Sequence, residues 1–387
     1  MFDFSSFLSN KAFITEDHHV YTYADLLGLS ERFSEHLVPR SLIFIGCENS
    51  LESIVAYVSC LRSGVVPLLL SRDVPDETLY HLEAIYHPRY CWFPSRRDLL
   101  VKGKEKYSLG GYSLIQYDGD SPVLPEGLAL LLTTSGSTGS PKLVRLSHDN
   151  LKSNACSIIE YLKITSSEKA ITSLPMYYSY GLSVLNSHLL AGATLLLTDK
   201  SYVQREFWKF VLEEKATSFA GVPFTYEILK KMRFEKFLPS SVKVMTQAGG
   251  KLNSSLIKYF SEYARLHDIR FYVMYGQTEA TARMSYLPAE YTLNKVGSVG
   301  VAIPGGHFSL IDEDGMRIVS PNVEGELVYE GSNVFWGYAE SLDDLFKGDE
   351  NKGILYTGDL AYVDSEGFYY ISGRKKRFLK LYGNRIS

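Results

Sequence analysis

A segment rich in hydroxyl groups and glycines is the strongest sign of chemistry in the sequence. Residues 134–142 read Thr-Ser-Gly-Ser-Thr-Gly-Ser-Pro-Lys, in which five of nine residues carry a hydroxyl and two are glycines. Glycines let the backbone approach an anion, and successive N–H groups form a concave anion site to which Lys142 adds a cation. This chemistry suggests a loop that holds a polyphosphate, with Lys142 as a catalytic candidate. The phosphate-binding candidates are Thr134, Ser135, Gly136, Ser137, Thr138 and Gly139.

Two other interpretations of this loop are open. A stretch rich in serine and glycine is often a flexible surface linker. Here the apolar run Leu128 to Leu132 leads straight into it and a second apolar run, Leu143 to Leu146, follows, so a linker would be unusually tightly bracketed. A P-loop NTPase also places a glycine-rich loop after a strand, but its GxxxxGK[ST] spacing is absent.

A second polar segment, 275–279, reads Tyr-Gly-Gln-Thr-Glu and follows an apolar run. A hard cation that bridges phosphate oxygens prefers a carboxylate such as Glu279, and a phosphorus centre under attack is stabilised by a hydroxyl donor such as Thr278. Alone, Glu279 would be interpreted as a carboxylate favoured by a helix N-terminus. Beside Thr278, a catalytic and metal-binding function is favoured.

The loop and this segment resemble, in order, two motifs of the acyl-adenylate-forming (AMP-binding) superfamily, which includes acyl- and aryl-CoA synthetases, nonribosomal peptide adenylation domains and luciferase. In that family the loop orients the β- and γ-phosphates of ATP. The resemblance implies that Tyr275 stacks on adenine, that Thr278 contacts the α-phosphate and that Glu279 holds Mg²⁺. Gly276 and Gln277 would belong to the same nucleotide-binding segment.

Further motifs of the family follow near the end of the chain. Asp359, in Tyr-Thr-Gly-Asp, resembles the residue that binds both ribose hydroxyls, a task suited to a carboxylate because it accepts two hydrogen bonds at once. Arg374 resembles a ribose-contacting arginine. Lys376 falls at the family's hinge position, and Arg385 fits the segment just beyond it. Taken alone, Asp359 would be a turn residue and Arg374 part of a solvated basic run.

The resemblance also places an acid pocket. Tyr178 stands where many relatives carry a gating histidine, and Ser179 stands where amino-acid adenylation domains carry an aspartate that holds the ammonium. Because an unpaired buried ammonium is costly, an acid without an α-amine is predicted. The remaining pocket candidates are Pro223, Phe224, Gly249 and Gly250. Of these, Phe224 would equally fit ordinary packing of a helix.

Hydrophobic patterns predict the elements that position these residues. Strands at 42–47 and 65–70 flank a helix at 51–61. The alternation recurs at about 170–275, which implies parallel sheets with helices on both faces. There the strands are expected at 217–222, 242–245 and 271–274, and the helices at 205–214, 224–232 and 254–267. Turn signals at Asp314-Gly315 and Glu366-Gly367 predict antiparallel hairpins.

The predicted fold is therefore α/β, with two doubly wound α/β subdomains and a small antiparallel β-barrel-like subdomain. An N-terminal adenylate-forming domain is expected over 1–375, divided at about 1–170, 171–290 and 291–375. Residues 376–387 would hold the hinge and the start of a C-terminal domain truncated at Ser387.

Composition excludes several other classes. The net charge of −4 offers no basic face for nucleic acid. Neither a signal peptide nor a membrane-spanning run is evident, so a cytoplasmic location is predicted. The cysteines, expected to be reduced core residues without a metal, are Cys47, Cys60, Cys91 and Cys156.

The predicted function is ATP- and Mg²⁺-dependent activation of a small-molecule carboxylic acid to acyl-AMP, followed by transfer to a thiol. The acceptor would be coenzyme A or the phosphopantetheine of an acyl carrier protein. One alternative is a non-catalytic nucleotide- or acyl-binding module, because the family's last motif, with its catalytic lysine, would lie after Ser387. A luciferase-like oxygenase on the same scaffold is a third.

Overall fold

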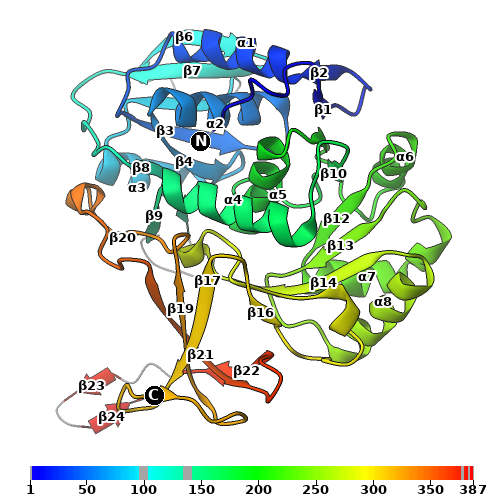
Figure 1. The fold of residues 1–387 in the computed structure, drawn as a ribbon. Helices are drawn as coiled ribbons and strands as arrows, with labels where there is room; N and C mark the ends of the chain where they lie inside the picture. The colour runs from blue at the N-terminus through cyan, green and yellow to red at the C-terminus, as the bar shows by residue number, and fades with distance from the viewer. Residues whose placement is uncertain (1, 96–102, 134–141, 376–378, 382–383, 387) are drawn as a thin grey trace.

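The computed structural model describes residues 2–95, 103–133, 142–375, 379–381 and 384–386. Figure 1 shows two large sheets with helices around them and a smaller β unit that extends from both. One cluster of buried apolar side chains takes residues from both large sheets, such as Ile43 and Leu195, so the two sheets share a hydrophobic core. The outer face of each sheet has a further cluster of its own.

The first large sheet has eight strands, of which the central four are parallel. Strands buried on both faces must be apolar along their whole length, as β3 and β8 are. In spatial order the strands are β20 (Gly337–Ala339), β9 (Leu143–Ser147), β8 (Leu128–Thr133), β4 (Val66–Ser71), β3 (Leu42–Cys47), β5 (Tyr90–Pro94), β7 (Tyr112–Tyr117) and β6 (Gly103–Leu109).

The second large sheet has nine strands and is parallel from β14 to β1. In spatial order these are β16 (Val301–Ala302), β15 (Ser285–Leu287), β14 (Arg270–Tyr275), β13 (Val244–Gln247), β12 (Ser218–Gly221), β10 (Lys169–Ile171), β11 (Thr194–Leu196), β1 (Lys11–Ile14) and β2 (Val20–Thr22). The prediction of parallel sheets is correct for the centres and wrong for the edges, where short return strands pair antiparallel in both sheets.

Helices cover the sheets, and α4 and α5 lie between the two large sheets (Figure 1). They are α1 (Tyr23–Ser34), α2 (Leu51–Ser63), α3 (Asp76–Tyr86), α4 (His148–Leu162), α5 (Ser179–Leu190), α6 (Arg205–Glu213), α7 (Pro223–Lys231) and α8 (Ser254–Leu266). Local chemistry fixes their ends: α4 begins with a capping box between Ser147 and Asn150, and α2 ends at Gly64, whose φ of 69° is easiest for glycine.

The small unit is a five-stranded antiparallel sheet. Its strands in spatial order are β18 (Arg317–Ile318), β17 (Gly306–Ile311), β19 (Gly325–Gly331), β21 (Ile354–Val363) and β22 (Tyr369–Arg374). The two predicted hairpins are confirmed, with Gly315 and Gly367 at positive φ in their turns. Separately, β23 (Leu379–Leu381) and β24 (Asn384–Ile386) pair antiparallel.

The predicted α/β class, with two α/β parts and a β part, is confirmed. The domain bounds at 170, 290 and 375 stay a prediction, and the sheets exchange strands across them. Strands β1 and β2, which lie in the predicted first part, belong to the second large sheet. Strand β20, which lies in the predicted β part, belongs to the first large sheet.

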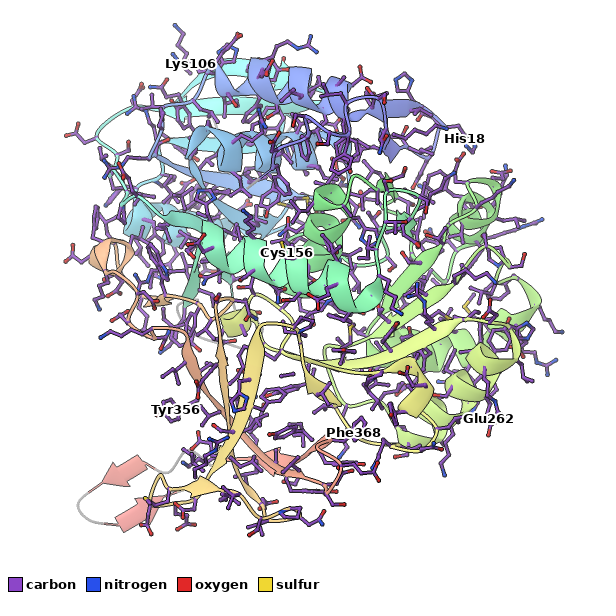
Figure 2. All side chains as sticks on the ribbon, viewed as in Figure 1. His18, Lys106, Cys156, Glu262, Tyr356 and Phe368 are labelled. Carbon is purple, nitrogen blue, oxygen red and sulfur yellow. The ribbon has the colours of Figure 1, made fainter. Side chains whose placement is uncertain are left out.

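The four cysteines do not share one environment. Cys47, Cys60 and Cys91 are buried, and burial raises the pKa of each thiol. The expectation of a core position is wrong for Cys156, which is exposed on α4 because it lies on the solvent side of that helix (Figure 2).

Candidate active site

A cavity of about 420 Å³ lies beyond the carboxyl ends of β13 and β14, where the second sheet meets α5 and the small β unit. Ligands of open α/β sheets bind at this end of the strands, because the loops that follow neighbouring strands converge there. Most of the described residues proposed from the sequence line it. They are Tyr178, Ser179, Gly249, Gly250, Tyr275, Gly276, Gln277, Thr278, Glu279, Asp359 and Arg374.

Several proposed residues lie elsewhere. Phe224 is 60% exposed and is not among the lining residues, because α7 begins one residue earlier and turns this side chain to solvent. Pro223 packs against Gly250, with its Cγ 3.2 Å from where a β-carbon on that glycine would stand. Arg385 lies in β24. Residues 134–139 of the phosphate loop and Lys376 lie outside the described residues, so their assigned functions stay predictions.

A hydrogen-bonded group joins the second sheet to the small β unit at one end of the cavity. Tyr275 donates its hydroxyl to Asp359 Oδ2 at 2.5 Å, and Gln277 Nε2 donates to the same oxygen at 2.9 Å. Burial and the neighbouring carboxylate raise the pKa of Tyr275 well above its usual value, so it stays a donor. Arg374, across the strand pair, places Nε 3.6 Å from Asp359 Oδ1. No described residue donates a hydrogen bond to Oδ1, so this oxygen can accept one from a ligand.

A second group lies around the short helix η3 (Thr278–Ala280). The hydroxyls of Thr278 and Ser179, the first residue of α5, are 3.0 Å apart. Glu279 Oε1 accepts a hydrogen bond of 2.6 Å from Tyr338. Lys142 lies near the same tyrosine, with Nζ 5.7 Å from its ring centre, and pairs at 2.5 Å with Glu340. The catalytic candidates are thus neighbours, although Lys142 does not line the cavity.

Two glycines at the cavity wall let the backbone lie in close contact with neighbouring atoms. A β-carbon on Gly276 would lie 1.8 Å from the carbonyl oxygen of Ala282, so only glycine fits that position. Gly249 has a φ of 80°, and a β-carbon there would lie 2.4 Å from the hydroxyl of Tyr178. Tyr178 therefore lies directly over the turn after β13, where the acid pocket is predicted.

Sequence reasoning missed three polar residues of this region. Gln247 is buried in the cavity lining, and its Oε1 has no hydrogen-bond partner among the described residues. Asn333 holds the loop after Glu279, donating to the carbonyls of Ala280 and Arg283 at 2.8 and 3.1 Å. Arg283 itself is buried beside the cavity. The one available signal was a charged residue inside the mostly apolar run after Glu279.

The residues fit a magnesium ion held partly by a nucleotide. No cluster of three or more His, Cys, Asp or Glu side chains suited to a metal occurs in the part of the chain that the structure describes. Mg²⁺ commonly takes one or two carboxylates, with phosphate oxygens and waters completing its octahedron. Glu279, which lines the cavity beside Thr278, is suited to be such a ligand.

Fold and cavity together define an α/β enzyme that binds its ligand at the ends of parallel strands. The model of the family described as "AMP-binding enzyme" matches residues 6–339. The chain belongs to this family, within the acyl-adenylate-forming superfamily, and its class is that of the AMP-forming acid–thiol ligases.

Among its relatives, the 2-succinylbenzoate–CoA ligase of Bacillus cereus is 32% identical over 400 residues, which cover 98% of this chain and 80% of that enzyme. In structure the chain is similar to O-succinylbenzoate coenzyme A synthetase of Bacillus subtilis in complex with AMP, with a TM-score of 0.77, 23% identity, and 97% and 78% of the two chains covered. It is also similar to the N-terminal domain of FACL13 from Mycobacterium tuberculosis, at a TM-score of 0.78 and 19% identity over 94% and 96%.

These comparisons support the predicted cofactors, ATP and Mg²⁺, since the Bacillus subtilis enzyme has also been solved with ATP and a magnesium ion. None of them supports the predicted carrier-protein partner. Among residues 2–95, 103–133 and 142–375, no helix has the length and apolar character to cross a membrane. The cytoplasmic location stays a prediction.

Proposed function

We propose that this chain uses ATP to activate a carboxylic acid that lacks an α-amine, and that it then transfers the acyl group to the thiol of coenzyme A. The observation that carries the proposal is the convergence of two groups in one cavity. The Thr278 and Glu279 pair lies beside the start of α5, and the Tyr275 and Asp359 pair lies where the small β unit begins. The first group suits the reacting phosphate, and the second suits the nucleoside.

The reaction divides into two balanced steps. A carboxylate oxygen of the acid attacks the α-phosphorus of ATP, the bond to the β-phosphate breaks, and pyrophosphate leaves with its electron pair. The thiol then attacks the acyl carbonyl of acyl-AMP, loses its proton, and AMP leaves. Thr278 would donate to the α-phosphate as charge develops, and Asp359 would accept from the ribose hydroxyls. Glu279 would hold Mg²⁺, which neutralises phosphate charge when bound.

The acid pocket supports a substrate without an amine. Ser179 offers a hydroxyl and no charge, and it is hydrogen-bonded to Thr278. The relatives are named for 2-succinylbenzoate, which has no amine and gives the first acid to test. Because these relatives are named as CoA ligases, coenzyme A is favoured over a carrier protein as the acceptor. A non-catalytic binding module is disfavoured, because the family is one of enzymes.

Acid-dependent exchange of labelled pyrophosphate into ATP tests the proposal. 2-Succinylbenzoate, aryl, aliphatic and α-amino acids form the panel, and an acid without an amine is expected to give the fastest exchange. Thr278→Val should slow that exchange on the order of a hundredfold, as loss of one preorganised donor does. Strong preference for a free amino acid would refute the pocket argument.

A further inference from the structure

Arg283 lies buried in the wall of the cavity and has no acidic partner among the residues that the structure describes. It is 2% exposed and lines both the large cavity and a second cavity of about 20 Å³. Its hydrogen-bond partners are uncharged: Nε donates to Ser183 Oγ at 3.1 Å, and Nη1 donates to the hydroxyl of Tyr161 at 2.9 Å and to Met274 Sδ at 3.4 Å. A buried charge is usually paired, so this arrangement requires an explanation.

The guanidinium also has unused donors. Of its five N–H groups, those of Nε and Nη1 are taken up, while neither hydrogen of Nη2 has an acceptor among the described residues. The cation lies 5.0 Å from the ring centre of Tyr180, which lines the cavity too. Glu168 lines the smaller cavity, but its Oε2 is hydrogen-bonded to Thr217. The charge of Arg283 is thus met by a ring face and by neutral dipoles alone in the described chain.

We propose that Arg283 binds a second anionic group of the acid, a carboxylate remote from the one that is activated. Two neighbouring residues of α5 link Arg283 to the reacting end of the cavity. Ser179 is hydrogen-bonded to Thr278, and the ring centre of the next residue, Tyr180, lies 5.0 Å from the Arg283 cation. The free Nη2 can donate to a carboxylate oxygen, and the guanidinium charge offsets the charge of that group. This inference rests on the proposed function and narrows its substrate to dicarboxylic acids.

The same cation gives a second reason for excluding an α-amine, because a positive charge in the wall repels an ammonium. A purely structural function is the competing explanation, since Arg283 links α4, α5 and β14 through Tyr161, Ser183 and Met274. That function requires donors and packing only. Selectivity between a diacid and a matched monoacid therefore separates the two explanations.

The test measures binding, so that it needs no turnover. Calorimetric titrations of AMP-saturated protein compare 2-succinylbenzoate with 4-oxo-4-phenylbutanoate, which lacks only the ring carboxylate, and heptanedioate with heptanoate. The unsubstituted chain is expected to bind the diacid of at least one pair on the order of a hundredfold more tightly. Arg283→Met should reduce that ratio to near one, and Arg283→Lys, which keeps the charge but loses the Nη2 donor, should retain part of it.

Two results would overturn the inference: equal binding of diacid and monoacid in both pairs, or an unchanged ratio in Arg283→Met. If Arg283→Met does not fold, the ratio in Arg283→Lys decides, and an unreduced ratio there contradicts a contact through Nη2. AMP binding, measured in the same samples, keeps the two proposals apart. Its loss in the unsubstituted chain would refute the nucleotide site, whereas intact AMP binding without diacid preference refutes only the function of Arg283.

Discussion

Replacing Asp359 with asparagine is expected to weaken nucleotide binding while leaving the fold intact. The side chain is 13% exposed, and its Oδ2 accepts from both Tyr275 and Gln277. In the variant the amide oxygen must take that place, since an amide nitrogen there would face two donors. The amide nitrogen then faces Arg374 and the ribose site, where an acceptor is needed.

The size of the effect follows from what the ribose loses. A hydrogen bond to a charged acceptor contributes about 1.5–3 kcal/mol, and the substitution removes the charge together with one acceptor. We therefore expect a loss of about 2–3 kcal/mol, which corresponds to a roughly 30- to 150-fold rise in the Kd for AMP. Unfolding by urea should change little, because the interior hydrogen bonds of Asp359 are kept.

Calorimetric titration with AMP and with 2′,3′-dideoxy-AMP measures this directly. The dideoxy nucleotide should bind the unsubstituted protein and Asp359→Asn with similar affinity, because it has no hydroxyls to donate. Glu330→Gln makes the same chemical change at an exposed position of β19 and should behave like the unsubstituted protein. If Asp359→Asn still prefers AMP over the dideoxy form by the unsubstituted protein's ratio, the assignment of Asp359 to the ribose is wrong.

Three further outcomes are expected. Glu279→Gln should raise the magnesium concentration for half-maximal pyrophosphate exchange about tenfold, because an amide oxygen binds Mg²⁺ more weakly than a carboxylate; an unchanged magnesium titration would remove Glu279 from the metal site. Gly276→Ala should cost about 1–3 kcal/mol in urea unfolding, since its β-carbon would lie 1.8 Å from the oxygen of Ala282. Gly28→Ala, where no atom of the described chain lies within 4 Å of the new β-carbon, should cost nothing measurable, and equal losses would contradict the close-approach argument. Burial lowers the pKa of His188 from 6.5 to about 4. The folded protein therefore favours the neutral imidazole, and the full stability is present above pH 6.5. About 2 kcal/mol of the free energy of unfolding should be lost as the pH falls from about 7 to 5. His188→Gln should lose less over that interval, and a loss equal to that of the unsubstituted protein would show that another group is responsible.

The elements that sequence reasoning predicted well are those with local signals. The helix expected at 51–61 forms over Leu51–Ser63, because Ser50 caps its start and Gly64 ends it in the left-handed region. The strand at 42–47 forms with the expected bounds, because an uninterrupted apolar run suits a strand buried on both faces.

The short edge strands could not be predicted in the same way. Strand β20 has three residues and pairs with β9, with Gly337 opposite Arg145, so its partner lies far away in the sequence. Strands β15 and β16 are similarly short, and pairing rather than local pattern defines them. Such strands turn the edges of otherwise parallel sheets antiparallel.

The residues of the site also differ in how far the sequence could predict them. The Tyr-Gly-Gln-Thr-Glu segment is contiguous, so its side chains could be assigned to one site from the sequence. The contact of Tyr275 with Asp359 joins residues 84 positions apart and depends on how the β unit packs. Arg283 was missed because it is notable only for being buried without an acidic neighbour among the described residues. Only the packed structure reveals such an arrangement.

The most direct test of the central claim follows one oxygen atom. The protein, at a concentration equal to that of ATP so that a single slow turnover suffices, is mixed with magnesium, coenzyme A and the preferred acid labelled with ¹⁸O in its carboxylate. Mass spectrometry of the products should find one ¹⁸O in the phosphate of AMP and none in pyrophosphate, because the carboxylate oxygen that attacks the α-phosphorus leaves with AMP. Label in pyrophosphate or in inorganic phosphate, or unlabelled nucleotide with every acid of the panel, would contradict acyl-adenylate formation by this chain.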